Sequence, residues 1–201
     1  MSSASQHQGR ITPSDTAIVL VDHQPGVLAM VGSLPASAVT ANAGMLARLG
    51  EEMGIPLVIT STRETLEFLG TNLDSISEAA PVAYARRVRR AGSLNAFDDP
   101  AFVDAVRNTQ RKKLVIAGLL TDVCLFHSVR SGLDAGYEVH VVADASGTTT
   151  ALGDLVTYDR LRELGAVVTT TYGTIFELYP DLSSEEGQRA EGVATRALVP
   201  A

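Results

Sequence analysis

Residues 112–129 read KKLVIAGLLTDVCLFHSV, and the fold class is predicted first from this segment. It contains Leu114–Leu120, a run that is apolar on both faces, as is typical of a parallel strand covered by helices on both sides. A polar turn then leads to Cys124 and to a predicted helix over Leu125–Leu133, which stops before Gly136. The stretch therefore predicts a strand, a turn and a helix, with a cysteine between strand and helix.

The same alternation extends along the rest of the chain. The other predicted strands are Ala17–Asp22, Pro56–Ser61, Glu138–Ala143, Ala166–Thr171 and a weaker one at Val82–Val88. The other predicted helices are Ser37–Met53, one capped by Asp98 or Asp99 with Pro100 in its first turn and running to about Gln110, and Leu152–Leu164, which ends at Gly165. This order predicts an α/β, Rossmann-like, doubly wound domain with a mainly parallel sheet flanked by helices.

A chain of 201 residues fits one domain, and its composition of 45% hydrophobic and 19% charged residues excludes a disordered or fibrous protein. We divide it into a flexible N-terminal segment (1–13), the domain itself (14–179) and a C-terminal extension (180–201). The extension is expected either to pack on a partner subunit or to form a simple tail.

The charge and the cysteine content of the chain limit the classes of partner that we expect and the cellular compartment. A net charge of −7 disfavours nucleic acid, because phosphate backbones are repelled. The apolar runs are too short to span a bilayer, and Met1–Gly9 lacks a signal-peptide core, so no membrane partner is expected. One cysteine permits no internal disulfide and no cysteine metal cluster, and it suits a reducing compartment. We therefore expect a cytoplasmic protein.

Two residues at strand ends are the first candidates for chemistry. Ligands of doubly wound sheets bind beyond the carboxyl ends of the strands, where the strand order reverses, and the strands leading to Asp22 and Cys124 are expected to be neighbours there. Cys124 at a helix start is either a buried structural residue or a nucleophile with a lowered pKa. Asp22 either caps a turn or is a buried base that takes the thiol proton.

A cation beside the thiol has several candidates. The segment ARRVRRAGSLNAF (85–97) carries Arg86, Arg87, Arg89 and Arg90, although a basic run is also typical of a solvated face. Lys112 and Lys113 are nearer to Cys124 in sequence, but they begin the strand whose other end leads to it. Roughly seven residues at ~3.3 Å each place these lysines about 23 Å from the site.

The histidines offer a different base. His23 follows Asp22 and His127 lies three residues beyond Cys124, so either would form a Cys–His pair, whereas His140 lies inside a strand and is expected in the core or an interface. No two histidines have the spacing of metal ligands, and neither a GxGxxG motif nor a P-loop is present. We therefore expect neither a metal nor another cofactor.

Four segments together resemble the isochorismatase-like cysteine hydrolase superfamily, and in particular its YcaC-like branch. They are AIVLVDHQPG (17–26), RRAGSLNAFDDPAFVDAV (89–106), KKLVIAGLLTDVCLFHSV (112–129) and GYEVHVVADASGT (136–148). The resemblance runs from about Thr16 to Leu178. It implies a six-stranded parallel sheet, a catalytic Asp–Lys–Cys triad and assembly into tetramers or octamers.

Carried over residue by residue, the resemblance assigns Asp22 and Cys124 to the triad and places Arg90 at the lysine position, where that branch also has arginine; Arg87 or Arg89 are alternatives. Arginine does not deprotonate at working pH, so acid–base work falls to Asp22. The resemblance also implies an oxyanion hole from the backbone N–H groups of Leu120 and Cys124, behind a cis Leu119–Leu120 peptide. The Asp-x-His-x-His metal loop of nicotinamidases has no counterpart in Thr62–Leu69.

The sequence thus predicts a hydrolase that cleaves a small-molecule amide through a cysteine thiolate and an acyl-enzyme. One alternative is an isochorismatase-type hydrolase without a covalent step, and another is a catalytically silent oligomeric binding protein on the same fold. Candidate residues for the substrate pocket are Asn95 and four residues that are also candidates for the core, Leu28, Phe97, Tyr172 and Phe176.

Overall fold

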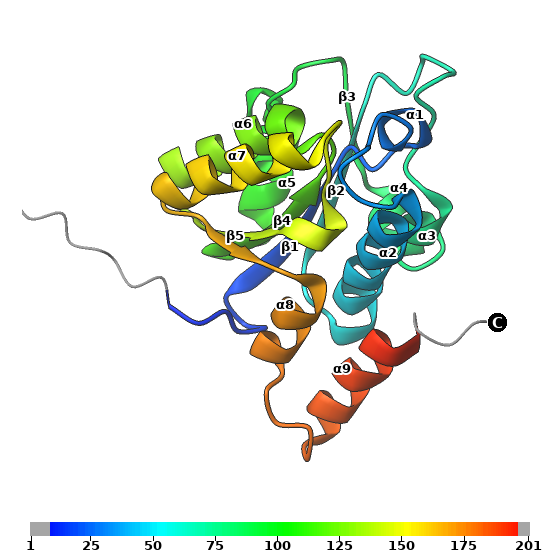
Figure 1. Ribbon diagram of the computed structural model, residues 1–201. Helices are drawn as coiled ribbons and strands as arrows, with labels where there is room; N and C mark the ends of the chain where they lie inside the picture. The colour runs from blue at the N-terminus through cyan, green and yellow to red at the C-terminus, as the bar shows by residue number, and fades with distance from the viewer. Residues whose placement is uncertain (1–8, 197–201) are drawn as a thin grey trace, which may run out of the picture.

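The computed structural model describes residues 9–196 and is built on one six-stranded sheet. All neighbouring strands are parallel, in the order β3-β2-β1-β4-β5-β6, with helices on both faces (Figure 1). The strands are β1 (Thr16–Val21), β2 (Leu57–Thr62), β3 (Val88–Arg90), β4 (Lys113–Gly118), β5 (Glu138–Val142) and β6 (Val167–Thr169). The predicted fold class is confirmed, and β1 and β4 are neighbours where the strand order reverses.

The two faces of the sheet bury two separate hydrophobic clusters, because successive side chains of a strand point to opposite sides. On β1, Ile18 and Leu20 belong to one cluster and Val19 and Val21 to the other. The first cluster packs under α2 (Ala36–Met53), α3 (Asp74–Ser77), α4 (Pro81–Ala85), α8 (Thr171–Leu178) and α9 (Glu185–Arg196). The second packs under α5 (Pro100–Asn108), α6 (Phe126–Asp134) and α7 (Ala151–Glu163).

The longer predicted helices and strands agree with the structure to within one or two residues at most ends. The Asp99 side chain accepts from the backbone of Ala101 and Phe102 to cap α5, and Gly54 follows α2 in the left-handed conformation. A short helix that the sequence did not predict, α1 (Pro25–Leu28), follows the first strand. None of the helices in residues 9–196 is long and apolar enough to cross a membrane.

The weak strand predicted at Val82–Val88 is wrong. Pro81 begins helix α4, and the strand that follows is β3, which pairs with the end of β2 so that Arg90 lies opposite Thr62. Proline suits the first turn of a helix, and the three residues of β3 are too few to show a period of two in the sequence. The position of β3 matters because it places Arg90, its last residue, at the carboxyl edge of the sheet.

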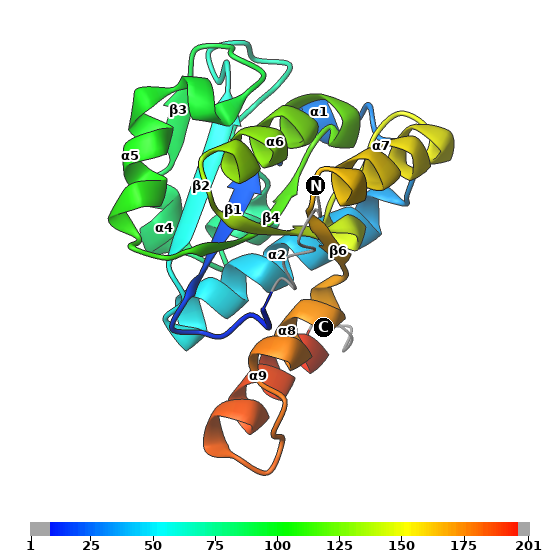
Figure 2. The same ribbon diagram turned by 90° about the vertical axis from the view of Figure 1, so that its left-hand side faces the viewer.

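The two terminal segments contribute to the domain. Residues 1–8 of the predicted flexible segment lie outside the described residues, but Ile11 is fully buried and its backbone N–H donates to Glu177 Oε1 at 3.1 Å. In the extension, α9 packs on α2 and α8 of its own chain, below the sheet in Figure 2. Neither hypothesis for residues 180–201, a partner contact or a simple tail, anticipated this packing.

The contact between α9 and α2 has a polar rim around an apolar centre. Val193 and Ala194 are buried in the first cluster, while the Arg196 guanidinium makes two contacts with the Glu52 carboxylate at 2.7 and 3.2 Å. Because the ion pair is largely exposed, we assign most of the stabilisation to the apolar centre.

Val193→Ala is expected to lower the free energy of unfolding by about 2 kcal/mol, because it removes two buried methyl groups. The measurement is urea unfolding of the whole chain, with the exposed Glu191→Ala on the same helix as the matched control. Equal, small effects for both variants would contradict the packing of α9 as part of the core.

Candidate active site

The carboxyl ends of three strands bring together the candidate residues Asp22, Arg90 and Cys124. Asp22 directly follows β1, has a left-handed backbone (φ 57°), and donates its N–H to Thr60 O on β2 at 3.0 Å. Arg90 ends β3, and Cys124 follows β4. The side chains of Asp22 and Arg90 are completely buried, so they meet away from water.

Arg90 is the arginine that reaches Asp22. Its Nη2 donates to Asp22 Oδ2, its Nε donates to the Thr60 hydroxyl at 3.0 Å, and its Nη1 donates to the backbone of Ser93. The Thr60 hydroxyl in turn donates to Val88 O at 2.9 Å. These contacts fix the guanidinium, and they leave Asp22 Oδ1 buried without a hydrogen-bond partner in the described part of the chain.

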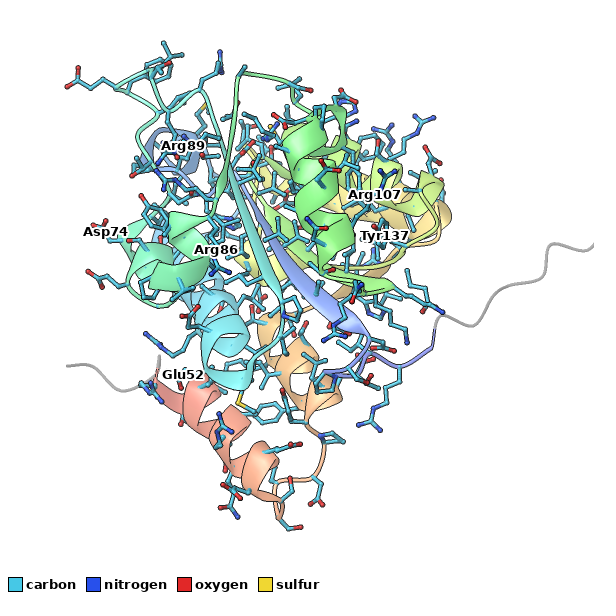
Figure 3. All side chains as sticks on the ribbon, turned by 180° about the vertical axis from the view of Figure 1, so that it is seen from behind. Glu52, Asp74, Arg86, Arg89, Arg107 and Tyr137 are labelled. Carbon is cyan, nitrogen blue, oxygen red and sulfur yellow. The ribbon has the colours of Figure 1, made fainter. Side chains whose placement is uncertain are left out.

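The other arginines of the basic run have different surroundings. Arg87 makes two hydrogen bonds to Glu64, at 2.7 and 3.0 Å, and Arg89 contacts the same carboxylate at 3.4 Å. Figure 3 labels Arg89 near the carboxyl end of β3 and the exposed Arg86 at the end of α4. Arg86 therefore fits the interpretation of a solvated face, whereas Arg87 and Arg89 form ion pairs with Glu64.

Cys124 lies in a π-helical turn, η2 (Thr121–Leu125), that precedes α6. The turn is marked by the Leu125 N–H, which donates to Leu120 O at 3.2 Å, and such turns are frequent at functional sites. The cysteine is 6% exposed and packs in the second apolar cluster. Gly118 lets β4 approach β1 closely here, because a Cβ on it would stand 2.8 Å from the Val21 Cβ.

The electrostatics of the thiol differ from the sequence-based expectation. Burial, and then the negative charge of Asp22, raise the pKa of Cys124 to about 12, although Arg90 acts in the opposite direction. The expectation that a helix start would lower this pKa is wrong, because the thiol lies among apolar groups and faces a carboxylate. Burial also raises the pKa of Asp22, and the charge of Arg90 offsets this only in part.

The peptide before the cysteine turn has the form that the resemblance implies. The Leu119–Leu120 bond is cis. The N–H of Leu119 donates to Val21 O and that of Thr121 to Gly147 O, each at 3.0 Å, whereas within residues 9–196 the N–H of Leu120 has no acceptor. Among the described residues, the Leu120 amide at the start of the cysteine turn therefore differs from the amides on both sides of it.

Three of the five candidate pocket residues lie on the segments around the site. Leu28 packs in a small apolar cluster with Leu119 and Leu120. Asn95 donates to the Ser131 hydroxyl of α6 at 3.0 Å, and Phe97 packs edge-to-face on Phe102 with ring centroids 5.1 Å apart. Asn95 and Phe97 line a cavity between α5 and α6, which also contains Arg107 and Tyr137 (Figure 3) but no member of the triad.

Tyr172 and Phe176 take the core role that the sequence also left open for them. Both lie on α8 and pack against the first apolar cluster, on the opposite face of the sheet from Cys124. The Tyr172 hydroxyl donates to Ala194 O of α9 at 3.0 Å. Tyr172 thus joins α8 to α9, and the Phe176 ring lies 5.9 Å from the Tyr172 ring. The aromatic residue types alone do not distinguish this role from a pocket.

The histidine and lysine alternatives also acquire definite positions. His23 is completely buried and its Nε2 contacts Ala145 O at 2.8 Å, so it is tied to the backbone. His127 is exposed on α6 with its ring against Phe126. Lys113 pairs with Thr16 at the opposite end of β1 from Asp22 and forms a salt bridge with Asp15 at 3.1 Å. None of the three meets the Cys124 thiol.

Comparison with known proteins places this geometry in a family. The family model of the isochorismatase domain matches residues 16–172. The chain belongs to the isochorismatase family. It is 34% identical over 187 residues to the probable hydrolase YcaC of Escherichia coli, across 92% of this chain and 86% of the relative.

Two solved structures of isochorismatase-family proteins match over nearly the whole chain. Escherichia coli YcaC, described as an octameric hydrolase of unknown specificity, has a TM-score of 0.87 at 31% identity, covering 95% of this chain and 91% of that one. Pseudomonas aeruginosa YcaC, solved with hexane-2,5-diol and covalent acrylamide, has a TM-score of 0.85 at 31% identity, covering 94% and 93%. The fold and the resemblance to the YcaC-like branch are thereby confirmed.

This isochorismatase-family site contains residues that the sequence reasoning missed. Thr60 and Ser93 hold the guanidinium of Arg90, and Glu64 gathers Arg87 and Arg89. Their only sequence signal is a position at or after the end of a predicted strand. Within residues 9–196, no three His, Cys, Asp or Glu side chains gather as metal ligands.

The buried His23 predicts a dependence of stability on pH. Burial lowers the pKa of His23 to about 4, from 6.5, so the unfolded chain takes up this proton first. Stability from the neutral ring is therefore lost as the pH falls from 6.5 to about 4.

Between pH 7 and pH 5, wild type is expected to lose about 2 kcal/mol more unfolding free energy than His23→Gln, which keeps an N–H donor. Urea unfolding at the two pH values measures this difference, and the exposed His127→Gln is the control. The hypothesis would be wrong if wild type and His23→Gln lost equal stability.

Proposed function

We propose that this isochorismatase-family protein is a hydrolase that cleaves the C–N bond of a small-molecule amide through Cys124. The observation that carries the proposal is the meeting of Asp22 and Arg90 beside the Cys124 thiol, whose pKa both charges shift. Within residues 9–196, the other oxygen of this carboxylate, Asp22 Oδ1, is buried without a hydrogen-bond partner. A buried base next to a nucleophile is the arrangement that covalent acyl transfer requires.

The first half-reaction begins with the thiol proton. Asp22 takes it as the Cys124 sulfur attacks the amide carbonyl carbon, and the carbonyl oxygen becomes an oxyanion. The C–N bond then breaks, and the leaving amine receives the proton from Asp22. Water attacks the resulting thioester with Asp22 again as the base, which releases the acid and restores the thiol.

The raised pKa of the Cys124 thiol determines at which stage of the reaction its proton is transferred to Asp22. A pKa of about 12 keeps Cys124 neutral until a carbonyl is in place, so attack and proton transfer occur together. The raised pKa of Asp22 makes this carboxylate a stronger proton acceptor than an exposed one. Arg90 supplies positive charge to the pair but does not carry protons.

The backbone N–H groups of Leu120 and Cys124 form the proposed oxyanion hole. The free amide of Leu120 supports this assignment, since the amides on both sides of it already have acceptors. Each such donor is worth ~3 kcal/mol in the transition state. Leu28, which packs with Leu120, and the segment around Asn95 remain our candidates for the substrate pocket.

A known relative supports the covalent step. Pseudomonas aeruginosa YcaC carries covalent acrylamide, which is an electrophilic amide, so a group in that protein reacts with such a molecule. We propose the corresponding reactivity for Cys124. The relative in Escherichia coli is octameric, and we propose that this chain also forms a homo-oligomer, a tetramer or an octamer.

The structure also carries one observation in favour of a catalytically silent binding protein. A thiol with a pKa near 12 is a poor nucleophile at neutral pH when no base acts on it. The two functions differ in whether Asp22 relieves this barrier, and the next experiment separates them. The unpaired thiol also suits the cytoplasmic location that we expect.

Cys124→Ala and Cys124→Ser are expected to lower kcat on a small amide by about a thousandfold or more, because both remove the sulfur nucleophile. Turnover of a panel of small primary amides measures this, and a rapid acid quench with mass spectrometry detects the thioester on wild type. The matched control is His127→Ala, an exposed neighbour on α6.

Unchanged turnover in both cysteine variants would contradict the covalent mechanism. Turnover that is lowered by substitutions in the candidate substrate pocket, with no thioester detected, would favour hydrolysis without a covalent step. A wild type that turns over no amide would favour the binding protein.

Replacement of Arg90 predicts a shift in the pH profile. Asp22 must be deprotonated to act, and the positive charge of Arg90 lowers the pKa of Asp22 against the larger effect of burial. Arg90→Met is therefore expected to move the rising limb of kcat/KM to higher pH by about one unit or more. Arg90→Lys, which keeps the charge, should shift it less, and Arg86→Gln should not shift it; identical limbs in all four proteins would contradict this role.

A further inference from the structure

A basic pocket adjoins the triad at the carboxyl ends of β2 and β3. It has a volume of about 520 Å³ and is lined by Arg63, Glu64, Thr65, Arg89, Arg90 and Ala91. Arg90 is shared between this pocket and the ion pair with Asp22. The pocket therefore lies directly beside the proposed catalytic machinery.

Arg63 has an unusual backbone for a residue of its type. In the described chain, the non-glycine residues with a positive φ are Asp22, Arg63 and Gln110. Gln110 follows helix α5, where the left-handed conformation is common, but Asp22 and Arg63 each follow a strand directly. Their shared conformation turns the chain at the catalytic edge, and the Arg63 N–H is held by Arg90 O at 2.9 Å.

The Arg63 guanidinium is available to a ligand. The residue is exposed, and within residues 9–196 its side chain makes no hydrogen bond or ion pair. Its aliphatic part runs beside Gly92, where a Cβ would stand 3.3 Å from the Arg63 Cδ. The side chain is thus packed along one side while its charged end lacks a partner.

The carboxylates nearby are already occupied. Glu64 accepts two hydrogen bonds from Arg87 and one from the Ser61 hydroxyl at 2.6 Å, and it contacts Arg89. Asp22 is paired with Arg90, and the charge of Arg63 also acts on Asp22 and lowers its pKa against the larger effect of burial. The Arg63 charge is therefore close enough to affect the pKa of Asp22. In the described chain, neither Asp22 nor Glu64 forms an ion pair with Arg63.

Local charge opposes the charge of the whole chain. The net charge is −7, but four arginines, 63, 87, 89 and 90, lie at this edge together with Asp22 and Glu64. A local excess of cations in an acidic protein attracts a small anion to this pocket. An exposed, unpaired guanidinium is the group best suited to bind a carboxylate.

We propose that Arg63 binds a carboxylate on the substrate, so that the substrate class is a small amide that also bears a carboxylate. This rests on the proposed function only in naming an amide as the reacting group. Arg63 acts as a specificity-determining residue: it positions the anionic end while the amide carbonyl faces Cys124.

The first test uses two alkylating probes that differ in charge, iodoacetate and iodoacetamide. In each reaction a sulfur–carbon bond forms at Cys124, a carbon–iodine bond breaks, iodide leaves and the thiol proton goes to solvent through Asp22. Because the chain has one cysteine, the intact mass reports that site alone. The measured quantity is the ratio of the iodoacetate rate to the iodoacetamide rate, relative to N-acetylcysteinamide.

The ratio of the iodoacetate rate to the iodoacetamide rate is expected to be about tenfold higher for wild type than for N-acetylcysteinamide. Arg63→Gln should bring the ratio to that of the reference, and Arg63→Lys should keep part of the preference. Arg86→Gln, an exposed arginine outside this pocket, is the matched control and should match wild type. A ratio that is the same in wild type and Arg63→Gln would overturn the proposal.

The second test compares succinamate with its neutral isostere succinamide as hydrolysis substrates. Wild type is expected to prefer succinamate in kcat/KM, and Arg63→Gln to lose that preference. Hydrolysis of both with equal preference in both proteins would overturn the role of Arg63 and leave the amidase proposal standing. An Arg63-dependent alkylation ratio without hydrolysis of either amide would instead overturn the amidase proposal and leave the anion site standing.

Discussion

The buried ion pair between Asp22 and Arg90 is the interaction on which the site depends. Removing two charges from water costs several kcal/mol per ion, so such a pair survives only with good geometry and additional hydrogen bonds. Thr60 and Ser93 provide those bonds to the guanidinium. The pair also joins β1 to β3 across β2, and it therefore ties the edge of the sheet to its centre.

The same burial sets the chemistry of the cysteine. Apolar packing and the charge of Asp22 hold the thiol neutral, while burial strengthens Asp22 as a base. In the mechanism that we propose, the thiolate forms only as the carbonyl is attacked. Arg90 is buried and paired with Asp22, whereas Arg63 is exposed. We propose that Arg90 stabilises the reacting pair and that Arg63 binds the substrate.

Much of the fold and part of the site followed from local patterns. Buried parallel strands are continuous apolar runs, so β1, β2, β4 and β5 were predictable, and so was the meeting of Asp22 with Cys124 at neighbouring strand ends. The short strand β3 was not, because two of its three residues are arginines, whereas β6, of equal length, lies in the apolar run that predicted it. Arg63 was missed since nothing in the letters TRETLEFL distinguishes a free arginine from a paired one.

Local sequence patterns were enough for the main alternation of strands and helices, for the family and for the candidate site residues, because periodicity and motif spacing are properties of neighbouring residues. The folded arrangement was needed to show which of four arginines meets Asp22, why the Cys124 pKa rises, and that Tyr172 contacts α9. These depend on burial and on contacts between residues far apart in the chain. Desolvation and pairing are set by what surrounds a side chain, and the surroundings exist only once the sheet has formed.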